Sequence, residues 1–374
     1  MKVLGIICEY NPFHSGHKYQ IETAKKLCNA DAVVAIMSGN YAQRGDVAIF
    51  NKDLRAKSAL LNGVDLVIDF PSVMSLCSAE RFAFCGVSLL DAMNIDCFSF
   101  GTETLDIMAI GEIAHILAEE DWEYKESLDK YLKQGLSFAA ARSKALHDVT
   151  VFTDDVISMP NNILAIEYMK AKYKLDSKIS PVPVYRKGNG YNSDKTDGEF
   201  ISATAARTLI ENKESCEGYV PDNVLSLYEN AKIHKIANME KAIIANLCKM
   251  SVEEIAETPD VSEGLENRIK KYAMESNSFI ELCDKIKSKR YAHSRIRRIL
   301  LQSYLGIKKS DLLPPQYIKI LDFNENGQKV LNKIKQETKL PLVKNFNQVK
   351  ELSNPLAEEM WKKELLFDRI YDLF

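Results

Sequence analysis

The chain has 374 residues, of which 46% are hydrophobic and 27% are charged, an ordinary composition for a globular protein that is long enough for two domains. Its formal net charge of −3 excludes a generally basic chain, so positive charge that serves binding must be concentrated locally. We find no signal peptide and no apolar run near the roughly 18 residues that span a bilayer, so we expect a cytoplasmic protein with no membrane partner.

The first predicted element is a buried strand over residues 3–7, followed by a turn and a helix. The turn carries His14 and His17 around Gly16, and a glycine lets the backbone approach a ligand closely. The N–H groups and dipole at a helix start favour an anion, and both imidazoles can donate hydrogen bonds to one phosphate. The pattern predicts phosphate chemistry, but four residues are a short motif, and ordinary turn and cap histidines are the alternative.

Strands and helices then alternate along the first half of the chain. We predict buried strands over residues 32–37, 65–68 and 96–100, and a later strand nearer a sheet edge over 181–185. The helices between them each show one shared face, formed by Ile21, Ala24 and Cys28 in the first and by Leu54, Ser58 and Leu61 in the second. This alternation predicts an α/β fold with a Rossmann-like, doubly wound parallel sheet, whose ligands lie beyond the C-terminal ends of the strands.

Polar loops follow two of these strands. The loop after the second strand carries side chains that can grip a small substrate or a base, or simply form a surface loop: Ser38, Asn40, Gln43 and Arg44. Gly101 follows the 96–100 strand, where it permits close approach of a purine or ribose or only forms a turn.

Three further segments are candidates for the same site. Residues 160–165 begin a helix with Pro and Asn, a common structural start. Residues 185–190 follow the late strand with cations that can meet phosphate or stay solvated. Ser202, Thr204 and Arg207 stand at another helix start, where hydroxyls and a guanidinium suit the outer phosphates of a nucleoside triphosphate, although Ser and Thr are also frequent N-caps.

The second half has a locally basic stretch. Residues 287–309 contain eight Lys or Arg and no Asp or Glu. We predict a helix there with a buried stripe formed by Ile296, Ile299, Leu300 and Tyr304, and with Arg290, Arg295, Arg297 and Arg298 projecting from the other faces near Tyr291 and His293. Arginines beside aromatic side chains suit RNA, while a solvated helix face is the alternative. We expect a mostly α-helical second domain from about residue 220.

Cysteine spacing favours neither a disulfide framework nor a metal site. The eight cysteines show no C-x-x-C pair, and five of them lie in apolar or helical surroundings: Cys8, Cys28, Cys77, Cys85 and Cys97. Buried thiols in a reducing compartment fit this pattern better than disulfides or zinc, so we expect no structural metal.

Several of these segments together resemble one known family. They read GIICEYNPFHSGH (5–17), MSGN (37–40), QRG (43–45), FGTE (100–103), PNNILA (160–165) and, in the second half, KRYAHSRIRR (289–298). The strand, H-x-G-H turn and I-S-x-T-x-x-R pattern resemble the nucleotidylyltransferase superfamily, with its HUP-type Rossmann-like sheet. The whole set is similar to the tRNA(Met) cytidine acetate ligase family.

The resemblance implies a ligase that activates acetate with ATP, forms acetyl-adenylate, and acetylates the wobble cytidine of elongator tRNA(Met). It implies an ATP-binding catalytic domain over residues 1–220 and a helical tRNA-binding domain over 221–374. ATP and Mg²⁺ are the expected cofactors, and tRNA and acetate the expected partners, with no DNA. Cys8 departs modestly from the aliphatic residue expected at its position.

The implied site residues are as follows. His14 and His17 would be catalytic. ATP would be bound by Ile7, Cys8, Glu9, Tyr10, Asn11, Pro12, Phe13, His14, Ser15, Gly16, His17, Lys18, Tyr19, Gln20, Gly101, Asn161 or Asn162, Arg186, Ser202, Thr204 and Arg207. The substrate loop would use Ser38, Asn40, Gln43 and Arg44. RNA would be bound by Lys289, Arg290, His293, Arg295, Arg297 and Arg298. Glu9 and Asp46 are candidates, by location alone, for the group that takes the proton from the attacking amine.

Two rival interpretations share part of this pattern. A small-molecule nucleotidylyltransferase in cofactor synthesis would use both phosphate motifs but leaves the basic helical stretch unexplained. A non-catalytic RNA-binding protein with a nucleotide fold would not need every phosphate-binding position to hold a competent residue. An aminoacyl-tRNA synthetase is disfavoured, because I-S-A-T-A-A-R stands where a lysine-rich K-M-S-K-S-like loop is expected.

Overall fold

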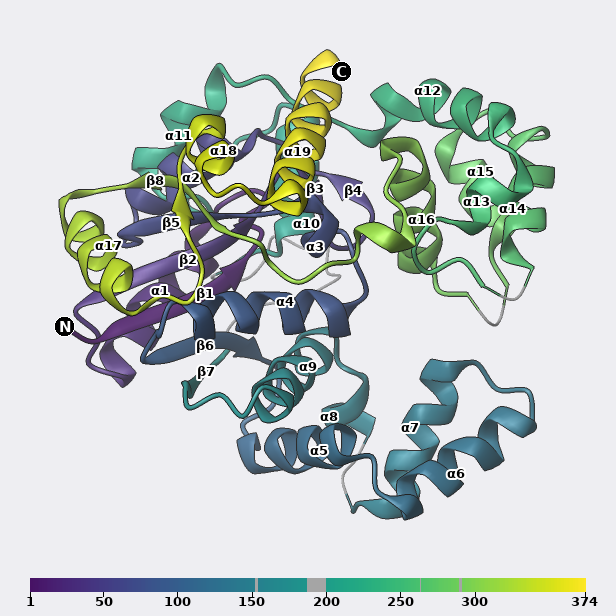
Figure 1. The fold of residues 1–374 in the computed structure, drawn as a ribbon, viewed down its shortest axis with the longest axis horizontal. Coiled ribbons are helices and arrows are strands. Elements are labelled where there is room, and N and C mark those ends of the chain that lie inside the picture. The colour runs from purple at the N-terminus through teal and green to yellow at the C-terminus, as the bar shows by residue number, and fades with distance from the viewer. Residues whose placement is uncertain (152–153, 187–199, 263, 289–290) are drawn as a thin grey trace.

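The computed structural model describes residues 1–151, 154–186, 200–262, 264–288 and 291–374. A seven-stranded sheet crosses its centre in the order β7-β6-β1-β2-β5-β8-β9 (Figure 1). These strands are β1 (Val3–Cys8), β2 (Ala32–Ser38), β5 (Leu66–Phe70), β6 (Cys97–Thr102), β7 (Ser180–Tyr185), β8 (Ile318–Phe323) and β9 (Leu342–Val343). The strands from β7 to β5 are parallel, whereas β8 runs antiparallel to β5. The predicted parallel α/β sheet is confirmed, with β7 at its edge.

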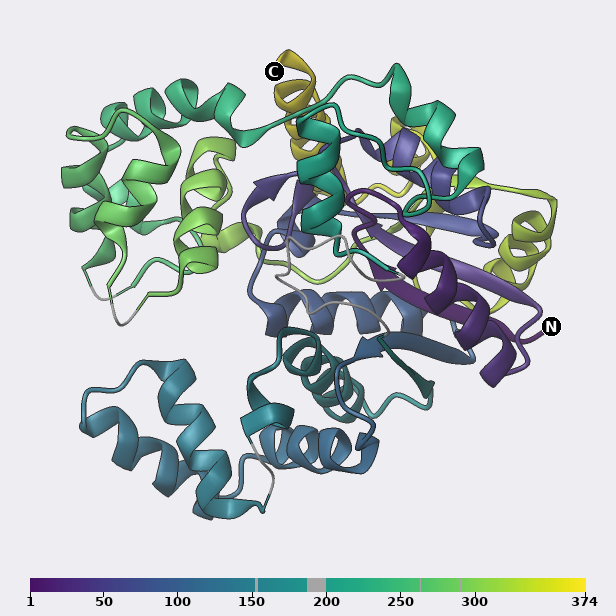
Figure 2. The same ribbon diagram turned by 180° about the vertical axis from the view of Figure 1, so that it is seen from behind.

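The central strands are apolar because both faces of the sheet are covered. In β1, Val3 and Ile7 pack into one core and Leu4 and Ile6 into the other. Helices α1 (Ser15–Leu27), α2 (Lys52–Leu60) and α11 (Asp222–Glu229) cover one face. Helices α3 (Ser72–Ser75), α4 (Ala79–Ala92), α9 (Pro160–Lys174) and α17 (Glu325–Glu337) cover the other (Figures 1 and 2).

The predicted helix faces are largely confirmed. Ile21, Ala24 and Cys28 are buried in and just after α1. On the second helix the prediction is wrong for Leu61, which is 47% exposed, because α2 ends at Leu60 and the chain turns away there. A short hairpin, β3 (Tyr41–Ala42) and β4 (Asp46–Val47), follows β2 and leads into α2.

Four helices are inserted between β6 and α9. They are α5 (Ile107–Glu119), α6 (Trp122–Lys133), α7 (Phe138–Val149) and α8 (Asp154–Ser158). Helix α5 packs on α9, while α6 and α7 pack on each other and project from the body of the protein (Figure 1). The insertion therefore extends the edge of the protein beside the sheet without changing the order of its strands.

A group of helices stands to one side of the sheet, and we call it the helical unit. Its members are α12 (Ile236–Lys249), α13 (Val252–Ala256), α14 (Leu265–Ala273), α15 (Phe279–Ile286) and α16 (His293–Leu305). Helix α10 (Ala203–Glu211) and α11 precede the unit in the chain, and the 3-10 helix η1 (Lys309–Asp311) follows it. Helix α16 is its inner member and faces the β3–β4 hairpin (Figure 1).

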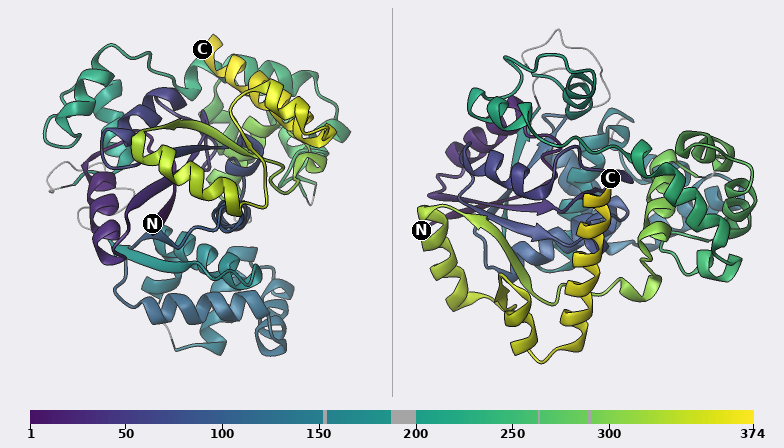
Figure 3. Two further views of the ribbon diagram at one scale, coloured as in Figure 1. Left: turned by 60° about the vertical axis from the view of Figure 1, so that its left-hand side comes forward. Right: turned by 90° about the horizontal axis from the view of Figure 1, so that it is seen from above.

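After the helical unit the chain returns to the sheet. Strands β8 and β9 extend the β5 edge, and α18 (Phe346–Glu351) and the long α19 (Pro355–Leu373) pack beside them (Figure 3). The sequence predicted helices here and missed both strands. The predicted domain boundary near residue 220 stays a prediction. Residues 318–374, however, pack against strands and helices of the first half of the chain. Among the described residues, no helix has the length and apolar character needed to cross a membrane.

Candidate active site

A cavity of about 760 Å³ lies beyond the C-terminal ends of β1, β6 and β7. Its floor includes Ile7 and Cys8 from β1, Gly101 from β6 and Val184 from β7. Parallel strands of a doubly wound sheet place their carboxyl ends, and the loops that follow, at one edge, where such folds bind ligands. The cavity extends from this edge past the β3–β4 hairpin to α16.

The turn after β1 presents two stacked imidazoles to the cavity. The ring centroids of His14 and His17 are 3.8 Å apart. The Nδ1 atom of His14 accepts a hydrogen bond from the Gly16 N–H at 3.1 Å, and Nδ1 of His17 accepts one from the His14 N–H at 3.3 Å. Because Nδ1 accepts in both rings, a neutral ring carries its hydrogen on Nε2. Each histidine can therefore donate that Nε2–H to an anion.

Burial and neighbouring cations keep both imidazoles neutral. Desolvation, together with repulsion from Arg186 and Arg207, lowers the pKa of His14 to about 3. The same burial, with His14 and Arg186 nearby, holds the pKa of His17 well below its usual value. At neutral pH the turn thus offers hydrogen-bond donors, and the positive charge beside it comes from arginines.

Gly16 is required by the closeness of the His14 ring. A Cβ atom at Gly16 would lie 2.9 Å from Cε1 and 3.0 Å from Nδ1 of His14. Any other residue would push that ring out of its hydrogen bond with the Gly16 N–H. The glycine of the motif is therefore explained by the packing of the first histidine.

A second helix start closes the same end of the cavity. Ser202 caps α10, and its hydroxyl accepts from the Ala205 N–H at 3.0 Å. Arg207 donates to the Asn11 carbonyl at 2.7 Å and to the Thr204 hydroxyl at 3.0 Å, which fixes its guanidinium between α10 and the first turn. Two helix N-termini, α1 and α10, thus meet at one cavity, an arrangement that suits a chain of phosphates.

The two adjacent asparagines have different positions. Asn161 lines the cavity, where its amide donates to Glu103 at 2.8 Å and its oxygen accepts from Arg186 at 3.3 Å. Asn162 is fully buried, and its oxygen accepts from the Glu103 N–H at 2.8 Å. The structure thus favours Asn161 as the residue that can reach a ligand.

The other end of the cavity is built by the hairpin and α16. Gln43, Arg44 and Asp46 line it from the hairpin, and the Gln43 N–H donates to Glu9 at 2.6 Å. From α16, Asp46 is met by Arg297, with 2.7 Å between Nη2 and Oδ2. Gly45, at a φ of 76°, packs on the α16 backbone so closely that a Cβ would lie 2.3 Å from the Arg298 nitrogen.

The arginines of α16 differ from the prediction that they project from free helix faces. Arg298 is buried, at 7% exposure, and its Nη2 lies 3.3 Å from the Asp260 carboxylate. Arg295 donates to the Asp260 carbonyl and to the Ser262 hydroxyl. These cations join α16 to the 258–262 turn, because burying a guanidinium requires partners. The predicted positions Lys289 and Arg290 lie outside the described residues.

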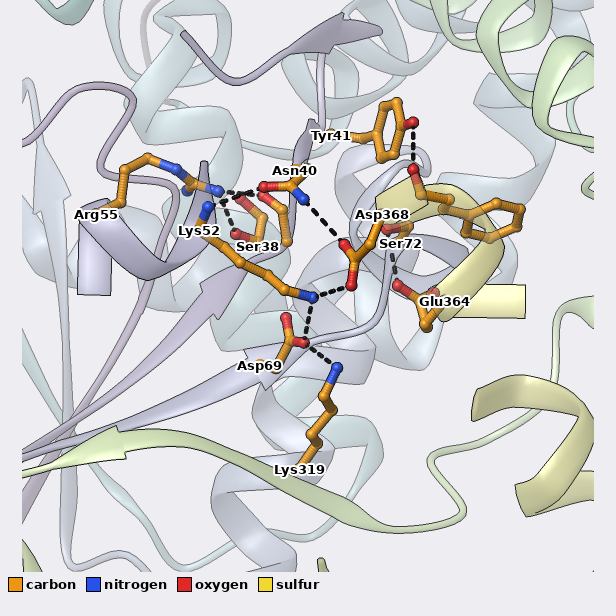
Figure 4. A network of polar contacts seen from close by, with 12 residues as sticks. Ser38, Asn40, Tyr41, Lys52, Arg55, Asp69, Ser72, Lys319, Glu364 and Asp368 are labelled. Atoms are coloured by element: carbon orange, nitrogen blue, oxygen red, sulfur yellow. Dashed lines mark hydrogen bonds and ion pairs between the residues drawn. The ribbon is translucent and has the colours of Figure 1, made fainter. Parts of the chain in front are cut away.

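Two residues of the predicted substrate loop are directed elsewhere. The Ser38 carbonyl accepts from Arg55, and Asn40 donates to Asp368 of α19 at 2.9 Å (Figure 4). Both are buried away from the cavity. Of the loop as predicted, Gln43 and Arg44 line the cavity and Ser38 and Asn40 support it.

Most of the predicted site residues lie at the cavity. The cavity is lined by these predicted residues: Ile7, Cys8, Glu9, Tyr10, Asn11, His14, Gly16, His17, Tyr19, Gln20, Gln43, Arg44, Gly101, Asn161, Arg186, Ser202, Thr204, Arg207, His293, Arg297 and Arg298. Pro12, Phe13, Ser15, Lys18, Asn162 and Arg295 are not among its lining residues. The sequence missed the apolar wall formed by Phe82, Leu164 and Tyr168, because such residues on α4 and α9 look like ordinary core positions.

All eight cysteines are free, and burial raises the pKa of Cys8, so its thiol stays protonated. In the part of the chain that the structure describes, no three His, Cys, Asp or Glu side chains are grouped so as to hold a metal ion.

A Rossmann-like sheet with an H-x-G-H turn at a helix N-terminus defines a nucleotidyl transferase. In agreement, the family model described as HIGH Nucleotidyl Transferase matches residues 1–374. Within that class, the chain belongs to the tRNA(Met) cytidine acetate ligase family. The tRNA(Met) cytidine acetate ligase of Thermoanaerobacter pseudethanolicus is 41% identical over 385 residues, covering 100% of this chain and 95% of that protein. The corresponding ligase of Caldanaerobacter subterraneus is 42% identical over 386 residues, with the same coverage.

Solved structures agree with this assignment. The crystal structure of Thermotoga maritima TmcAL in its apo form superposes with a TM-score of 0.91 at 32% identity, covering 98% of this chain and 92% of that one. The same protein bound with alpha-thio ATP gives a TM-score of 0.89, at the same identity and coverage. The family and the fold are thus confirmed, and the nucleotide in the second structure belongs to the Thermotoga maritima protein.

Proposed function

We propose that this protein is an ATP-dependent tRNA(Met) cytidine acetate ligase, which activates acetate and acetylates the wobble cytidine of elongator tRNA(Met). One observation of the site carries the proposal: two helix N-termini, two neutral histidines and two arginines meet at one cavity. The full-length similarity to ligases of that name supports the choice of substrates. The same substrates imply that it acts in the cytoplasm.

In the first step, an acetate oxygen attacks the α-phosphorus of ATP. The new O–P bond forms as the bond to the β-phosphate oxygen breaks, so that acetyl-adenylate and pyrophosphate result. Negative charge builds on the phosphate oxygens, and the Nε2–H groups of His14 and His17 with the start of α1 would stabilise it. Ser202, Thr204 and Arg207 would hold the outer phosphates.

Mg²⁺ would accompany the phosphates and offset their charge. It prefers oxygen ligands and keeps several waters, so phosphate oxygens and water can supply most of its coordination. Among the residues that the structure describes, Glu9 and Asp46 are the acidic side chains that line the cavity and are available to such an ion.

In the second step, the cytidine amine attacks the acetyl carbon. The C–N bond forms, the bond to the adenylate oxygen breaks, AMP leaves, and the amine loses a proton. Glu9 and Asp46 are our candidates to accept it. No covalent enzyme intermediate is needed, because holding an activated acyl group beside its nucleophile can lower the barrier by about 7–11 kcal/mol.

The test is transfer of radiolabelled acetate. Purified protein is incubated with ATP, Mg²⁺ and total cellular tRNA, and the nucleosides are separated after nuclease digestion. Label in acetylcytidine is expected. Pyrophosphate release without labelled tRNA would move the search to another acceptor, and the absence of both would overturn the proposal.

A further inference from the structure

The last helix, α19, directs one face toward the β3–β4 hairpin. Glu364, Phe367, Asp368 and Tyr371 have the three- and four-residue spacing that places side chains on one side of a helix. Phe367 and Tyr371 are each 1% exposed. Phe367, Asp368 and Tyr371 lie more than 300 positions after the loop they contact, so this packing joins the end of the chain to the edge of the active site.

Hydrogen bonds from this face grip the hairpin at its base. The Tyr41 hydroxyl donates to the Phe367 carbonyl at 2.8 Å, and the Asn40 amide donates to the Asp368 carboxylate at 2.9 Å (Figure 4). On the far side of the hairpin, the Tyr371 hydroxyl donates to the Ala48 carbonyl at 2.7 Å. The first strand of the hairpin and the residue that follows its second strand are therefore attached to one helix.

Asp368 is itself fixed by a buried chain of charges. Lys52 Nζ lies 2.6 Å from Asp368 and 2.9 Å from Asp69, and Lys319 Nζ lies 2.7 Å from Asp69 (Figure 4). Asp69 belongs to β5 and Lys319 to β8, so the chain of charges ties α19 to the sheet. Removing one partner of a buried ion pair is strongly destabilising, so these charges hold α19 against the sheet.

The tip of the same hairpin contributes residues to the cavity wall and also contacts helix α16. Gln43, Arg44 and Asp46 line the cavity, and Asp46 with Gly45 meets α16 of the helical unit. At the nucleotide end, by contrast, His14 and His17 are bonded within their own turn. The hairpin region also reaches the loop after β1, because the Gln43 N–H donates to Glu9 and the Ile49 N–H donates to Asn11. Neither bond involves the two imidazoles, so a displacement of the hairpin would disturb the end of the cavity beside α16 more than it would disturb His14 and His17.

We propose that Tyr41 and Asp368 are positioning residues for acetyl transfer to tRNA, through which α19 holds the hairpin at the acceptor end of the cavity. This rests on the proposed function, because the step it concerns is the second half of that reaction. The two side chains act through Gln43, Arg44 and Asp46 and need no contact with substrate.

The test separates the two half-reactions in D368N and Y41F. Acetate-dependent exchange of labelled pyrophosphate into ATP, without tRNA, measures adenylate formation. Acetylation of tRNA(Met) measures the complete reaction. We expect exchange close to that of the unmodified enzyme, and kcat for tRNA acetylation lowered by about ten- to a hundredfold, the range that a misplacement of about 1 Å produces.

E364Q is the matched control. Glu364 is buried one turn earlier on the same face of α19, but it accepts from Ser72 and the Val73 N–H, not from the hairpin. Burial and nearby Asp69 raise its pKa to about 7, so a neutral amide is a mild replacement. We expect both half-reactions to survive in E364Q, with thermal stability no lower than that of D368N, which leaves Lys52 with one of its two carboxylate partners.

The outcomes are distinct. Loss of tRNA acetylation with retained exchange in D368N and Y41F, but not in E364Q, supports the proposal. Equal loss of both half-reactions in all three variants, or normal acetylation in D368N and Y41F, overturns it. If the unmodified enzyme shows neither acetate-dependent exchange nor acetylation of tRNA(Met), the proposed function fails, independently of any effect of α19.

Discussion

The two ends of the cavity obtain their polar groups in different ways. At the nucleotide end, His14, His17 and Gly16 come from one short turn, and their hydrogen bonds are made within it. At the α16 end, Arg297 and Arg298 are held by Asp46 and Asp260, from distant parts of the chain. The two imidazoles of the first end are organised locally, before any ligand arrives, and Arg207 joins them from α10 through the Asn11 carbonyl. The second end depends entirely on how separate elements pack.

Because of this difference, the two ends of the cavity suit different parts of a substrate. The nucleotide end presents N–H donors with little cost in charge burial, which suits an anion of fixed shape. The α16 end presents arginines that already neutralise carboxylates, so a polyanion there competes with existing partners. Changes at the first end should therefore affect chemistry, and changes at the second should affect stability and assembly as well.

The largest effect is expected from His17→Ala at the nucleotide end. Removal of one pre-positioned donor to a developing charge typically lowers kcat by about 10²–10³-fold. Acetate-dependent pyrophosphate exchange measures this loss, with circular dichroism as the check on folding. His115→Ala is the control, since that histidine lies exposed on α5. Near-normal exchange in His17→Ala would remove this residue from the mechanism.

At the α16 end, Gly45→Ala tests how tightly the hairpin and the helical unit are packed. Its positive φ costs about 1 kcal/mol for a residue with a Cβ. The clash with the Arg298 nitrogen adds overpacking of about 1–3 kcal/mol. Denaturant unfolding measures the sum.

Gly135→Ala is the matched control for that variant. Gly135 has a φ of 82°, but a Cβ there would meet nothing within 4 Å. Gly135→Ala should therefore lose only the part of the stability that comes from the positive φ, about 1 kcal/mol. Equal losses in the two variants would show that the hairpin can move away from α16 without cost.

A smaller effect on the free energy of unfolding is expected from replacing Arg297 or Arg298 of α16, and the two replacements should differ. Arg298→Leu leaves Asp260 without its cation and should lower the free energy of unfolding by about 1–3 kcal/mol. The Arg297 pair with Asp46 is more exposed, so Arg297→Leu should cost about 0–1 kcal/mol. Denaturant midpoints of the two variants decide the order. The reverse order would contradict the burial assigned to Arg298.

The smallest change is expected in the pH dependence of ATP use. Both imidazoles have lowered pKa values, that of His14 being about 3, so they are neutral throughout the pH range 6 to 8. A profile of kcat/KM for ATP should show no inflection near 6.5 from these groups. An activity that falls as pH rises through 6.5 would instead indicate a charged imidazole.

The same groups predict a direction for stability. The unfolded chain protonates its histidines near 6.5, while the folded chain keeps these two neutral down to about 3 in the case of His14. The unfolded state thus binds more protons in this window. The contribution of these two histidines to the free energy of unfolding should be fully present above pH 6.5 and should decline as the pH falls toward 3. Thermal unfolding at several pH values measures this change.

The sequence predicted the local parts of the molecule and missed its long-range partners. The strand, turn and helix around His14 could be recognised because their signals lie within twenty residues. Arg298 was expected on a free helix face, because nothing near it in sequence indicates its pairing with Asp260. Asn40 was assigned to substrate for the same reason, since its partner Asp368 lies 328 positions later.

The strands of the C-terminal part were missed for a different reason. The sequence IKILDF of β8 is only partly buried and lies between segments with helical patterns, so its periodicity carried little weight. Its place in the sheet is decided by pairing with β5 from the other end of the chain. The roles of individual site residues and the division near residue 220 remain predictions.

The return of residues 318–374 to the sheet has a consequence for how the protein is made. The ribosome releases the N-terminal strands first, but Asp69 meets Lys319, and Asn40 meets Asp368, only when the last segment has emerged. Translation thus completes the nucleotide-binding half last, after the helical unit has been synthesised. A fragment cut at residue 220 would lack one edge of its sheet and the support of its hairpin, so we expect it to aggregate.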